Sequence, residues 1–401
     1  MESQPTILTI NAGSSSIKFA LFGVGDKPER IVDGVIERIG LEGTKIIIDD
    51  ERDGSVTHRI EAADHEDATR ILLDWVKHRT VGNSLQAVGH RVVHGGPYFH
   101  DPERVTLELL EKLRDLIIFD PLHLPSEIKL IEMIAELYPG LAQVVCFDTA
   151  FHHDLPEVAR MLPIPRKYQD KGIRRYGFHG LSYQYLLDEI KQSYGEERAQ
   201  GRLVLAHLGS GASLAAVHGG KSVDTSMGLT PAGGIMMSTR TGDMDPGLMA
   251  YLARSEKMDA QKFDQMINNA SGLLGVSETS ADMKVLLEQE QSDPRAQQAA
   301  DQFCYQVKKT IGAYAAAMGG IDTLVFTGGM GENAPKVRER VCAGLEFLGV
   351  SIDSNSNYQN AKEISADDVE VQVLVIHTDE AMTIAKSVSK LMQHNQLGDH
   401  N

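Results

Sequence analysis

The stretch LTINAGSSSIKFALF at residues 8–22 reads as an apolar strand, a turn of Asn, Gly and Ser, and a second apolar strand with one lysine. A very similar arrangement, LVLAHLGSGASLAAV, recurs at residues 203–217. Turns of Gly and small hydroxyl residues let backbone N–H groups approach an anion closely, and the hydroxyls add further donors. The two hairpins therefore predict two anion-binding turns, one in each half of the chain.

Strand-like and helix-like segments alternate along the whole chain, which indicates α/β layers with helices covering mixed sheets. Apolar periodicity predicts helices near residues 66–79, 107–119, 126–137, 245–270, 295–318 and 336–348, and a last helix from residue 380. Apolar runs predict strands at residues 44–50, 322–327 and 369–376. Residues 223–247 have no clear period, and long irregular stretches inside compact domains are more often functional than idle.

A chain of 401 residues exceeds what one core usually supports, so two domains are expected. The second hairpin restarts the strand pattern near the middle of the chain. We expect one domain of residues 1–150 together with a C-terminal helix at 386–401, carrying the first hairpin. The second domain, residues 151–385, would carry the second hairpin.

The composition excludes several classes of protein. A formal charge of −17 argues against nucleic-acid binding, and it means that local cations must attract any anionic ligand. No apolar run approaches the roughly 20 residues that span a bilayer, and the amino terminus lacks a signal-peptide pattern. Three scattered cysteines predict neither a disulfide framework nor a metal knuckle. We therefore expect a cytoplasmic protein without membrane contact.

Neither hairpin is a P-loop, because GxxxxGK[ST] is missing and each turn leads into a strand. The pair resembles the phosphate-binding hairpins of the sugar kinase, actin and Hsp70 superfamily, in which each domain supplies one hairpin. A third element, VFTGGMGENAP at residues 325–335, fits the strand, Gly-rich turn and helix that hold the nucleoside there. This resemblance implies two domains of the duplicated ribonuclease-H-like (actin-like ATPase) type around a central cleft.

Eight motifs narrow the resemblance to one family, and they span residues 8 to about 386: INAGSSSIKF, GHRVVHGG, FDTAFH, RRYGFHGLS, AHLGSGASL, SVDTSMGLTP, TRTGDMDPG and FTGGMGEN. Together they resemble acetate kinase. The resemblance implies reversible phosphoryl transfer from ATP to acetate, giving acetyl phosphate and ADP by direct in-line transfer. It also implies Mg²⁺, with Mn²⁺ as an alternative ion, and a homodimer. The second domain, residues 151–385, would then carry the adenosine motif and the dimer interface.

The resemblance assigns the chemistry to a few residues. An ionised carboxylate needs no general base, so the protein must hold two anions in line and neutralise the transferring group. Arg91 matches the residue that binds the substrate carboxylate, which a guanidinium fork suits. His179 and Arg240 match the residues that stabilise the transition state. Family accounts make Asp148 an acid/base residue; we expect it to order magnesium or its waters.

The remaining site residues follow from the same motifs. Val93, Leu122, Phe178 and Pro231 match a small apolar acyl pocket, although such residue types are commonly core. Asn11 and Glu380 match the positions associated with the metal. The residues expected to bind ATP are Lys18, Ser14, Ser16, His207, Leu208, Gly209, Ser210, Gly211, Asp282, Met283, Lys284, Gly329, Met330, Gly331, Glu332 and Asn333.

Three positions depart from the family pattern. Ser210 stands where Asn is common, Lys284 where the nucleotide contact usually ends in Arg, and Ser238 where a small Gly is more usual. The departures leave Arg91 and His179 untouched and put only the phosphoryl donor in doubt.

Other readings of the sequence stay open at this point. The same site suits a propionate or other short-chain carboxylate kinase, or the same acyl chemistry with another phosphoryl donor. A non-enzymatic nucleotide switch of the actin or Hsp70 kind would need the hairpins but has no use for the Arg and His residues. A metal-dependent hydrolase is suggested by FHHD, YFHD and HRVVH, none of which has HExxH spacing.

Overall fold

A computed structural model describes residues 5–13, 15–25, 27–50, 54–79 and 85–398 of the chain. The chain divides into two compact units, each described here by itself. Unit 1 consists of Met1–Ala150 and Asp379–Asn401, and unit 2 of Phe151–Thr378. From the sequence we expect the chain to return to its first domain at residue 386, whereas unit 1 resumes at Asp379.

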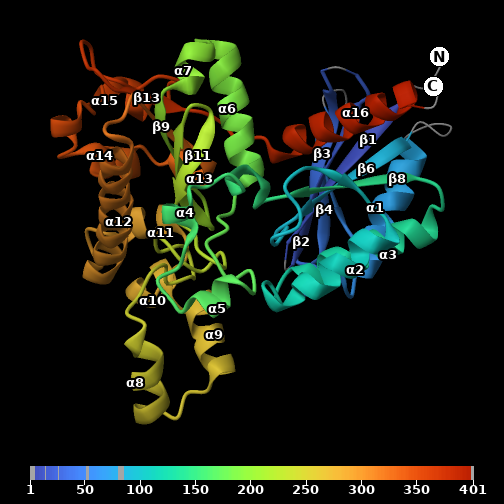
Figure 1. Cartoon of the computed structure of the whole chain (residues 1–401), viewed down its shortest axis with the longest axis horizontal. Coiled ribbons are helices and arrows are strands. Elements are labelled where there is room, and N and C mark those ends of the chain that lie inside the picture. The colour runs from blue at the N-terminus through green and yellow to red at the C-terminus, as the bar shows by residue number, and fades with distance from the viewer. Residues whose placement is uncertain (1–4, 14, 26, 51–53, 80–84, 399–401) are drawn as a thin grey trace. The chain divides into compact units, whose positions relative to one another are not determined.

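Unit 1 is built on a sheet of eight strands in the order β5-β4-β3-β2-β1-β6-β8-β7 (Figure 1). The strands are β1 (Thr6–Ala12), β2 (Ser16–Gly23), β3 (Glu29–Glu37), β4 (Lys45–Asp50), β5 (Gly54–Arg59), β6 (Leu85–Val92), β7 (Glu103–Arg104) and β8 (Ala142–Phe147). β1 and β2 form the first hairpin, in which Asn11 pairs with Lys18. β1, β6 and β8 run parallel to one another.

Unit 2 is built on a sheet of five strands in the order β11-β10-β9-β12-β13. The strands are β9 (Arg202–Leu208), β10 (Ala212–His218), β11 (Lys221–Thr225), β12 (Thr323–Thr327) and β13 (Gln372–Val375). β9 and β10 form the second hairpin, and β9, β12 and β13 run parallel. β13 is shorter than the predicted strand 369–376.

The two sheets share one topology. In each, the strand order runs from an antiparallel third strand through the hairpin to two parallel strands: β3-β2-β1-β6-β8 in unit 1 and β11-β10-β9-β12-β13 in unit 2. In each, the parallel strands follow the hairpin along the chain, with helices in the connections. The duplication predicted from the two hairpins is therefore confirmed.

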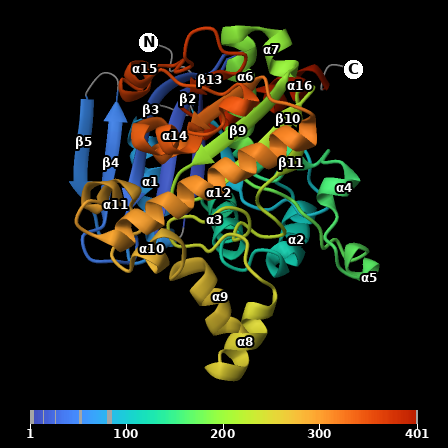
Figure 2. The same cartoon turned by 90° about the vertical axis from the view of Figure 1, so that its left-hand side faces the viewer.

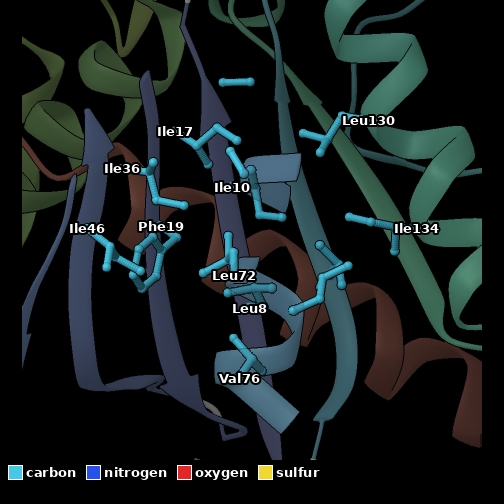
Figure 3. Close-up of a cluster of buried hydrophobic side chains, with 14 of the residues drawn as sticks. Leu8, Ile10, Ile17, Phe19, Ile36, Ile46, Leu72, Val76, Leu130 and Ile134 are labelled. Atoms are coloured by element: carbon cyan, nitrogen blue, oxygen red, sulfur yellow. The ribbon is translucent and has the colours of Figure 1, made fainter. Parts of the chain in front are cut away.

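One face of the sheet in unit 1 is covered by α1 (His65–Arg79), α2 (Leu107–Asp115), a 3₁₀ turn (Leu116–Ile118) and α3 (Leu124–Leu137). These agree with the predicted helices to within a few residues. Alternate residues of the hairpin, such as Leu8 and Phe19, pack with Leu72 and Val76 of α1 and Ile134 of α3 (Figure 3). Because side chains alternate across a strand, the residues between them point to the opposite face.

The opposite face is covered by α16 (Glu380–Gly398), the last element of the chain (Figure 1). Ala385 packs with Ala20 and Phe22 of β2. α16 also comes very close to β6 at Gly89, where a Cβ atom would lie 2.4 Å from Ile384 Cγ2 and 2.8 Å from Val388 Cγ2. The glycine that opens the motif GHRVVHGG is therefore required by the packing of the C-terminal helix.

We expect Gly89→Ala to destabilise unit 1 by about 1–3 kcal/mol, because the added methyl forces α16 away from the sheet. Urea unfolding would measure the loss, and hydrogen exchange would locate it in α16 and β6. Gly312→Ala is the matched control, since Gly312 lies within a helix and a Cβ there meets nothing within 4 Å. The control should be neutral or slightly stabilising; equal loss in both variants would contradict the close approach.

Most helices belong to unit 2. They are α4 (Glu157–Arg160), α5 (Arg166–Gln169), α6 (Gly180–Tyr194), α7 (Glu196–Gln200), α8 (Gly247–Ser255), α9 (Ala260–Asn269), α10 (Gly272–Ser277), α11 (Met283–Gln289), α12 (Pro294–Met318), α13 (Gly328–Asn333), α14 (Pro335–Cys342) and α15 (Ser354–Tyr358). Short 3₁₀ turns occupy Ala150–His152, at the junction of the units, and Glu346–Leu348. α12 crosses β9 and β10, whereas α8 and α9 extend away from the rest of the unit (Figure 2).

Two helix predictions in unit 2 need correction. The pattern at 245–270 is two helices, α8 and α9, because α9 starts anew at Asp259, whose side chain accepts from the backbone N–H of Lys262. The helix predicted at 336–348 ends at Cys342, because Gly344 adopts φ +84°. In the part of the chain that the structure describes, no helix has both the length and the apolar character to cross a bilayer.

Candidate active site

Three polar residues of unit 1 lie at the carboxyl ends of the adjacent parallel strands. Asn11 is near the end of β1, Arg91 near the end of β6, and Asp148 directly follows β8. Since parallel strands end at the same edge of a sheet, these side chains gather where α/β proteins commonly bind ligands. The structure thus brings together residues that are 137 positions apart in the sequence.

Arg91 is the centre of this group. Its Nη2 donates to Asp148 Oδ2 at 2.5 Å, and its Nη1 donates to Asn11 Oδ1 at 3.3 Å. Glu380 Oε2 lies 3.9 Å from Arg91 Nε and accepts from Asn11 Nδ2 at 3.2 Å. Burial alone would lower the pKa of Arg91, but the carboxylates of Asp148 and Glu380 outweigh it and raise the pKa further. The guanidinium is therefore a permanent cation.

Two atoms of the group are buried without a hydrogen-bond partner, Asp148 Oδ1 and Arg91 Nε. Asp148 itself has no exposed surface. Unpaired buried polar atoms are costly and point to an absent partner such as an ion, water or ligand. Asp148 Oδ1 is an acceptor, which suits a hydrated cation, and Arg91 Nε is a donor, which suits a carboxylate.

Glu380, the first residue of α16, carries a carboxylate beside that of Asp148. Burial raises the pKa of Glu380, and the charge of Asp148 adds to the rise, whereas Arg91 and Lys18 oppose it. Lys18 is exposed on β2, opposite Asn11 in the hairpin. Carboxylate and amide oxygens are the ligands that hard divalent cations prefer. Among the described residues, no group of three or more His, Cys, Asp or Glu is placed to hold a metal ion.

Glu127 is a site neighbour that sequence reasoning missed. It lies on α3, is 2% exposed, and accepts from the backbone N–H of Val93 at 3.1 Å through Oε2. Its Oε1 has no hydrogen-bond partner. Burial raises the pKa of Glu127 to about 8, although the charge of Arg91 opposes the shift. Only the position of Glu127 five residues after the expected pocket residue Leu122, on a helix face otherwise apolar, could have drawn attention to it.

The raised pKa of Glu127 makes the stability of unit 1 depend on pH. Between about pH 4.5 and 8 the folded chain keeps a proton that the unfolded chain has lost, so the free energy of unfolding falls as pH rises. Glu127→Gln keeps an acceptor for Val93 and removes the titration. We expect the variant to gain about 1–3 kcal/mol relative to the original chain on going from pH 5 to pH 8.5.

Urea unfolding at the two pH values measures this difference. Glu108→Gln is the control, because Lys112 holds the pKa of the exposed Glu108 carboxyl below its ordinary value, so Glu108 does not titrate in this range. Parallel pH profiles for the original chain and Glu127→Gln would show that Glu127 is ionised at neutral pH.

In unit 2, two predicted catalytic residues converge on the second hairpin. His179 directly precedes α6 in a left-handed conformation with φ 62°. A Cβ on Gly211 would lie 3.3 Å from His179 Nε2 and 3.6 Å from Arg240 Nη1. Both side chains therefore face the turn predicted to bind phosphate, and the absence of a side chain at Gly211 leaves them room to do so.

Arg240 is held by the irregular segment predicted at residues 223–247, most of which lies between β11 and α8 without helix or strand. The backbone N–H of Ser238 donates to the carbonyl of Ser210 in the hairpin turn at 3.2 Å, and Met237 N–H donates to the Arg240 carbonyl at 3.0 Å. Arg240 Nη1 also donates to the Pro231 carbonyl at 3.2 Å. The segment is irregular because it follows the turn, and its hydrogen bonds make it well defined.

His179 and His207 stack with ring centroids 4.2 Å apart and an angle of 18°. Each ring has a hydroxyl partner at Nδ1: Ser213 Oγ at 2.9 Å from His179, and Ser182 Oγ at 2.8 Å from His207. Ser182 Oγ also contacts Thr378 Oγ1 at 2.7 Å. His207, expected among the ATP-binding residues, thus lies directly against the predicted transition-state residue.

The motif FTGGMGEN forms the end of β12 and the whole of α13. Gly328 has φ 78°, and a Cβ there would lie 2.8 Å from the Leu208 carbonyl oxygen, so only glycine lets this turn approach the end of β9. Glu332 Oε1 accepts from the Gly328 N–H at 2.8 Å, and Oε2 lies 2.7 Å from His377 Nδ1. Glu332 therefore fixes its own turn to the segment after β13, which is a structural role.

Arg338 holds α13 in place through hydrogen bonds to its carbonyls. The sequence did not predict this role. Arg338 is fully buried, and it donates to the carbonyls of Gly331 and Glu332 at 2.8 and 2.9 Å. Its other hydrogen bonds go to oxygens of Asn357 and Asn360. Burial lowers the pKa of Arg338 to about 10. A buried arginine held by neutral oxygens fixes the carboxyl end of the predicted nucleoside-binding helix.

The other predicted residues fall into both units. Val93 (4% exposed) and Leu122 (55% exposed) belong to unit 1, and Phe178 (1% exposed) and Pro231 to unit 2. Asp282 accepts from the Lys284 N–H as the N-cap of α11, Met283 is buried, and Lys284 is exposed. Ser16 begins β2, Leu208 is buried and Ser210 is exposed, while Ser14 lies outside the described residues.

Comparison with known proteins decides the family. The model of the acetokinase family matches residues 6–386. The chain belongs to the acetokinase family. Membership makes the protein a kinase, implies ATP and ADP as substrates, and excludes the non-enzymatic nucleotide switch.

Curated members of the acetokinase family match almost the whole chain. The acetate kinase of Rhodopseudomonas palustris is 43% identical over 391 residues, covering 96% of this chain and 98% of its own. The propionate kinase of Citrobacter rodentium is also 43% identical, over 392 residues and 96% of both chains. Overall identity therefore does not separate the two named substrates.

Solved structures of the family confirm the fold. The acetate kinase of Porphyromonas gingivalis has a TM-score of 0.88 at 38% identity, covering 97% of this chain and 100% of its own. A propionate kinase from Francisella tularensis has a TM-score of 0.90 at 34% identity, covering 96% and 98%. The actin-like ATPase type predicted from the hairpins is confirmed for this acetokinase.

Proposed function

We propose that the protein is an acetate kinase that transfers the γ-phosphoryl group of ATP to acetate, reversibly and by direct in-line attack. The observation that carries the proposal is the convergence of His179 Nε2 and Arg240 Nη1 on the Gly211 turn. Two donors facing a Gly/Ser turn suit a phosphoryl group whose equatorial oxygens gather negative charge in the transition state.

Arg91 is the proposed partner of the acetate carboxylate. A guanidinium has five N–H donors, and Arg91 donates to Asp148 and Asn11. Its Nε is buried without a hydrogen-bond partner, so it remains able to donate to a substrate. Acetate is ionised at neutral pH, so its oxygen can attack without a base. This supports an electrostatic role for Asp148, which keeps Arg91 in place, over an acid/base role.

Mg²⁺ is the proposed metal, with Mn²⁺ as an alternative. The oxygens of Asn11, Glu380 and Asp148 are hard ligands, and Asp148 Oδ1 is buried without a partner. This donor set fits a cation that keeps several waters and is held by one or two carboxylates plus substrate phosphates. When bound, the ion would neutralise charge on the phosphate chain. Glu380 and Asp148 would hold its water shell.

The nucleotide would be held by the turns of the two hairpins and by α13. Lys18 and the serines of the first turn would meet the phosphates, and Gly209, Ser210 and Gly211 would do so from the second. The segment from Gly329 to Asn333 would hold the nucleoside. We propose that units 1 and 2 are the two domains that supply these parts.

Hydroxylamine trapping of acyl phosphate tests the activity. The assay crosses acetate, propionate and butyrate with ATP, GTP and pyrophosphate, with Mg²⁺ present or chelated. We expect the highest kcat/KM for acetate with ATP, and loss of activity on chelation. Arg240→Ala should lower kcat by about 10²–10³-fold, the usual effect of removing one transition-state donor.

Arg295→Ala is the matched control, because Arg295 forms an exposed ion pair with Glu278 in the same unit. It should leave activity unchanged. If no pair of substrates gives acyl phosphate, acetate kinase activity is refuted. Activity with pyrophosphate or GTP alone would keep the acyl site and reassign the donor.

Propionate kinase activity is the second candidate, and the propionate kinase relative at the same 43% identity favours it. One methylene in an apolar pocket is worth about 1–3 kcal/mol, so propionate should be a weaker substrate of an acetate kinase, not an excluded one. A higher kcat/KM for propionate than for acetate in the same assay would establish this candidate.

We also propose a cytoplasmic homodimer. The cysteines Cys146, Cys304 and Cys342 are buried free thiols, as expected of a reducing compartment. In unit 2, α8 and α9 contain no buried residue, although α8 presents Met249 and Tyr251, which are 38% and 60% exposed. A second copy of the chain would cover this apolar helix pair.

We expect light scattering after gel filtration to give twice the chain mass. Tyr251→Asp should raise the dissociation constant of the dimer about tenfold or more, because a charge would replace an aromatic contact. Tyr305→Asp is the control, since Tyr305 is 63% exposed on α12. A monomeric original chain, or equal weakening by both variants, would contradict the assignment.

A further inference from the structure

His179 lies at the end of a chain of three hydrogen-bonding side chains in unit 2. Tyr183 Oη is 2.5 Å from Ser213 Oγ, and Ser213 Oγ is 2.9 Å from His179 Nδ1. Neither Tyr183 nor Ser213 has any exposed surface. Water therefore cannot substitute for a lost contact without a change in the packing, and the protons of the three groups are interdependent.

The fold fixes all three groups in place. Tyr183 is on α6 four residues after His179, and its backbone N–H donates to the His179 carbonyl at 3.0 Å. The Tyr183 ring packs edge-on against His152 and tilted against Phe151, at centroid distances of 5.6 and 5.8 Å. Ser213 is on β10, directly after the Gly211 turn. The chain thus joins the predicted catalytic helix terminus to the predicted phosphate hairpin.

The directions of the hydrogen bonds decide which ring nitrogen carries the proton. A neutral imidazole has one ring proton, and a serine hydroxyl donates only one hydrogen bond. If Tyr183 donates to Ser213, then Ser213 donates to His179 Nδ1, and the ring proton lies on Nε2. If Nδ1 carries the proton, it donates to Ser213. The Ser213 proton then either goes toward Tyr183 or, when Tyr183 also donates to Ser213, is left buried without an acceptor, which is costly.

The first direction fits the chemistry of the groups. A phenol, with a pKa of about 10, is far more acidic than an alkyl hydroxyl and is the stronger donor of the two. The 2.5 Å separation of Tyr183 Oη and Ser213 Oγ is at the short end of O–H···O distances. The phenol therefore donates to Ser213, and the serine proton is directed to His179 Nδ1.

We propose that Tyr183 and Ser213 are positioning residues that hold neutral His179 as the Nε2–H tautomer. Nε2 is the nitrogen that faces Gly211, so its N–H points to where the proposed function places a phosphoryl oxygen. The opposite tautomer would present a lone pair to that anion and repel it. The inference rests on the proposed function for its catalytic consequence, but the tautomer itself can be observed without substrate.

Nitrogen NMR of the full chain labelled with ¹⁵N-histidine tests the tautomer directly. The chain has 15 histidines, so the signals of His179 are identified by their loss in His179→Gln. At pH 8 we expect a protonated Nε2 and an unprotonated Nδ1 in the original chain. Tyr183→Phe and Ser213→Ala should each shift His179 toward a mixture of tautomers. The tautomer is read in the original chain, and His179→Gln serves only to assign the signals.

Kinetics supply a second readout. Because the chain acts on His179, Ser213→Ala and Tyr183→Phe should lower kcat about tenfold or more while the KM values for ATP and acetate change less than about twofold. The controls are Thr323→Val and Tyr314→Phe in the same unit. Thr323 Oγ1 is buried without a hydrogen-bond partner, and Tyr314 is 5% exposed on α12. Both controls should keep the kcat of the original chain.

A protonated Nδ1 in neutral His179 would overturn the proposal, as would an unchanged kcat in both Tyr183→Phe and Ser213→Ala. An equal fall in kcat in the controls would also overturn it. If the original chain shows Nε2–H but no kinase activity with any substrate pair, the tautomer assignment stands and the proposed function fails.

Discussion

A buried carboxylate can exist in a fold only where a cation and hydrogen-bond donors offset the loss of water. Asp148 has no exposed surface, and Arg91 is the cation at 2.5 Å. Because Arg91 also reaches Asn11 and Glu380, this one ion pair fixes the ends of β1, β6 and β8 and the start of α16. The same cation is the proposed partner of the acetate carboxylate, so Arg91 would both hold the site together and bind the substrate.

Unit 2 supports its part of the site by different means. His179 and His207 rest on hydroxyl groups, and the segment around Arg240 is held by backbone hydrogen bonds to the hairpin turn. Arg338 donates to neutral oxygens of α13 and of α15. In a chain of net charge −17, an anionic substrate is repelled by the protein as a whole. Within its segment Arg240 donates to the neutral carbonyl of Pro231, a hydrogen bond that leaves its charge for the substrate.

Much of the fold could be predicted because the signals are local. The periodicity of α1 and the Gly/Ser turns of both hairpins are legible within 15 residues, and the repeat of the hairpins indicated the repeated sheet. The helix predicted at 336–348 failed because Gly344 interrupts it after Cys342, where a positive φ overrides the apolar pattern.

The catalytic candidates were found through motifs, but their supports were not. Asn11 donates a hydrogen bond to Glu380, 369 positions later in the sequence, and no local sequence pattern predicts such a contact. Glu127 and Arg338 look like ordinary helix-surface charges in the sequence, and only burial distinguishes them. Tyr183 could have been noticed, since it lies in the first turn of the helix that follows His179.

The position of α16 in the chain also affects the order in which the two units can fold during synthesis. The sheet of unit 1 is made from the first 150 residues, yet α16, which covers one of its faces, is synthesised only after the whole of unit 2. Unit 2 is a single continuous stretch and can complete its core while synthesis is still under way. Until α16 is made, the face of the unit 1 sheet that contains Phe22 and Gly89 has no helix to cover it. Unit 1 therefore depends on α16 to complete its core, although the strands of its sheet are synthesised first.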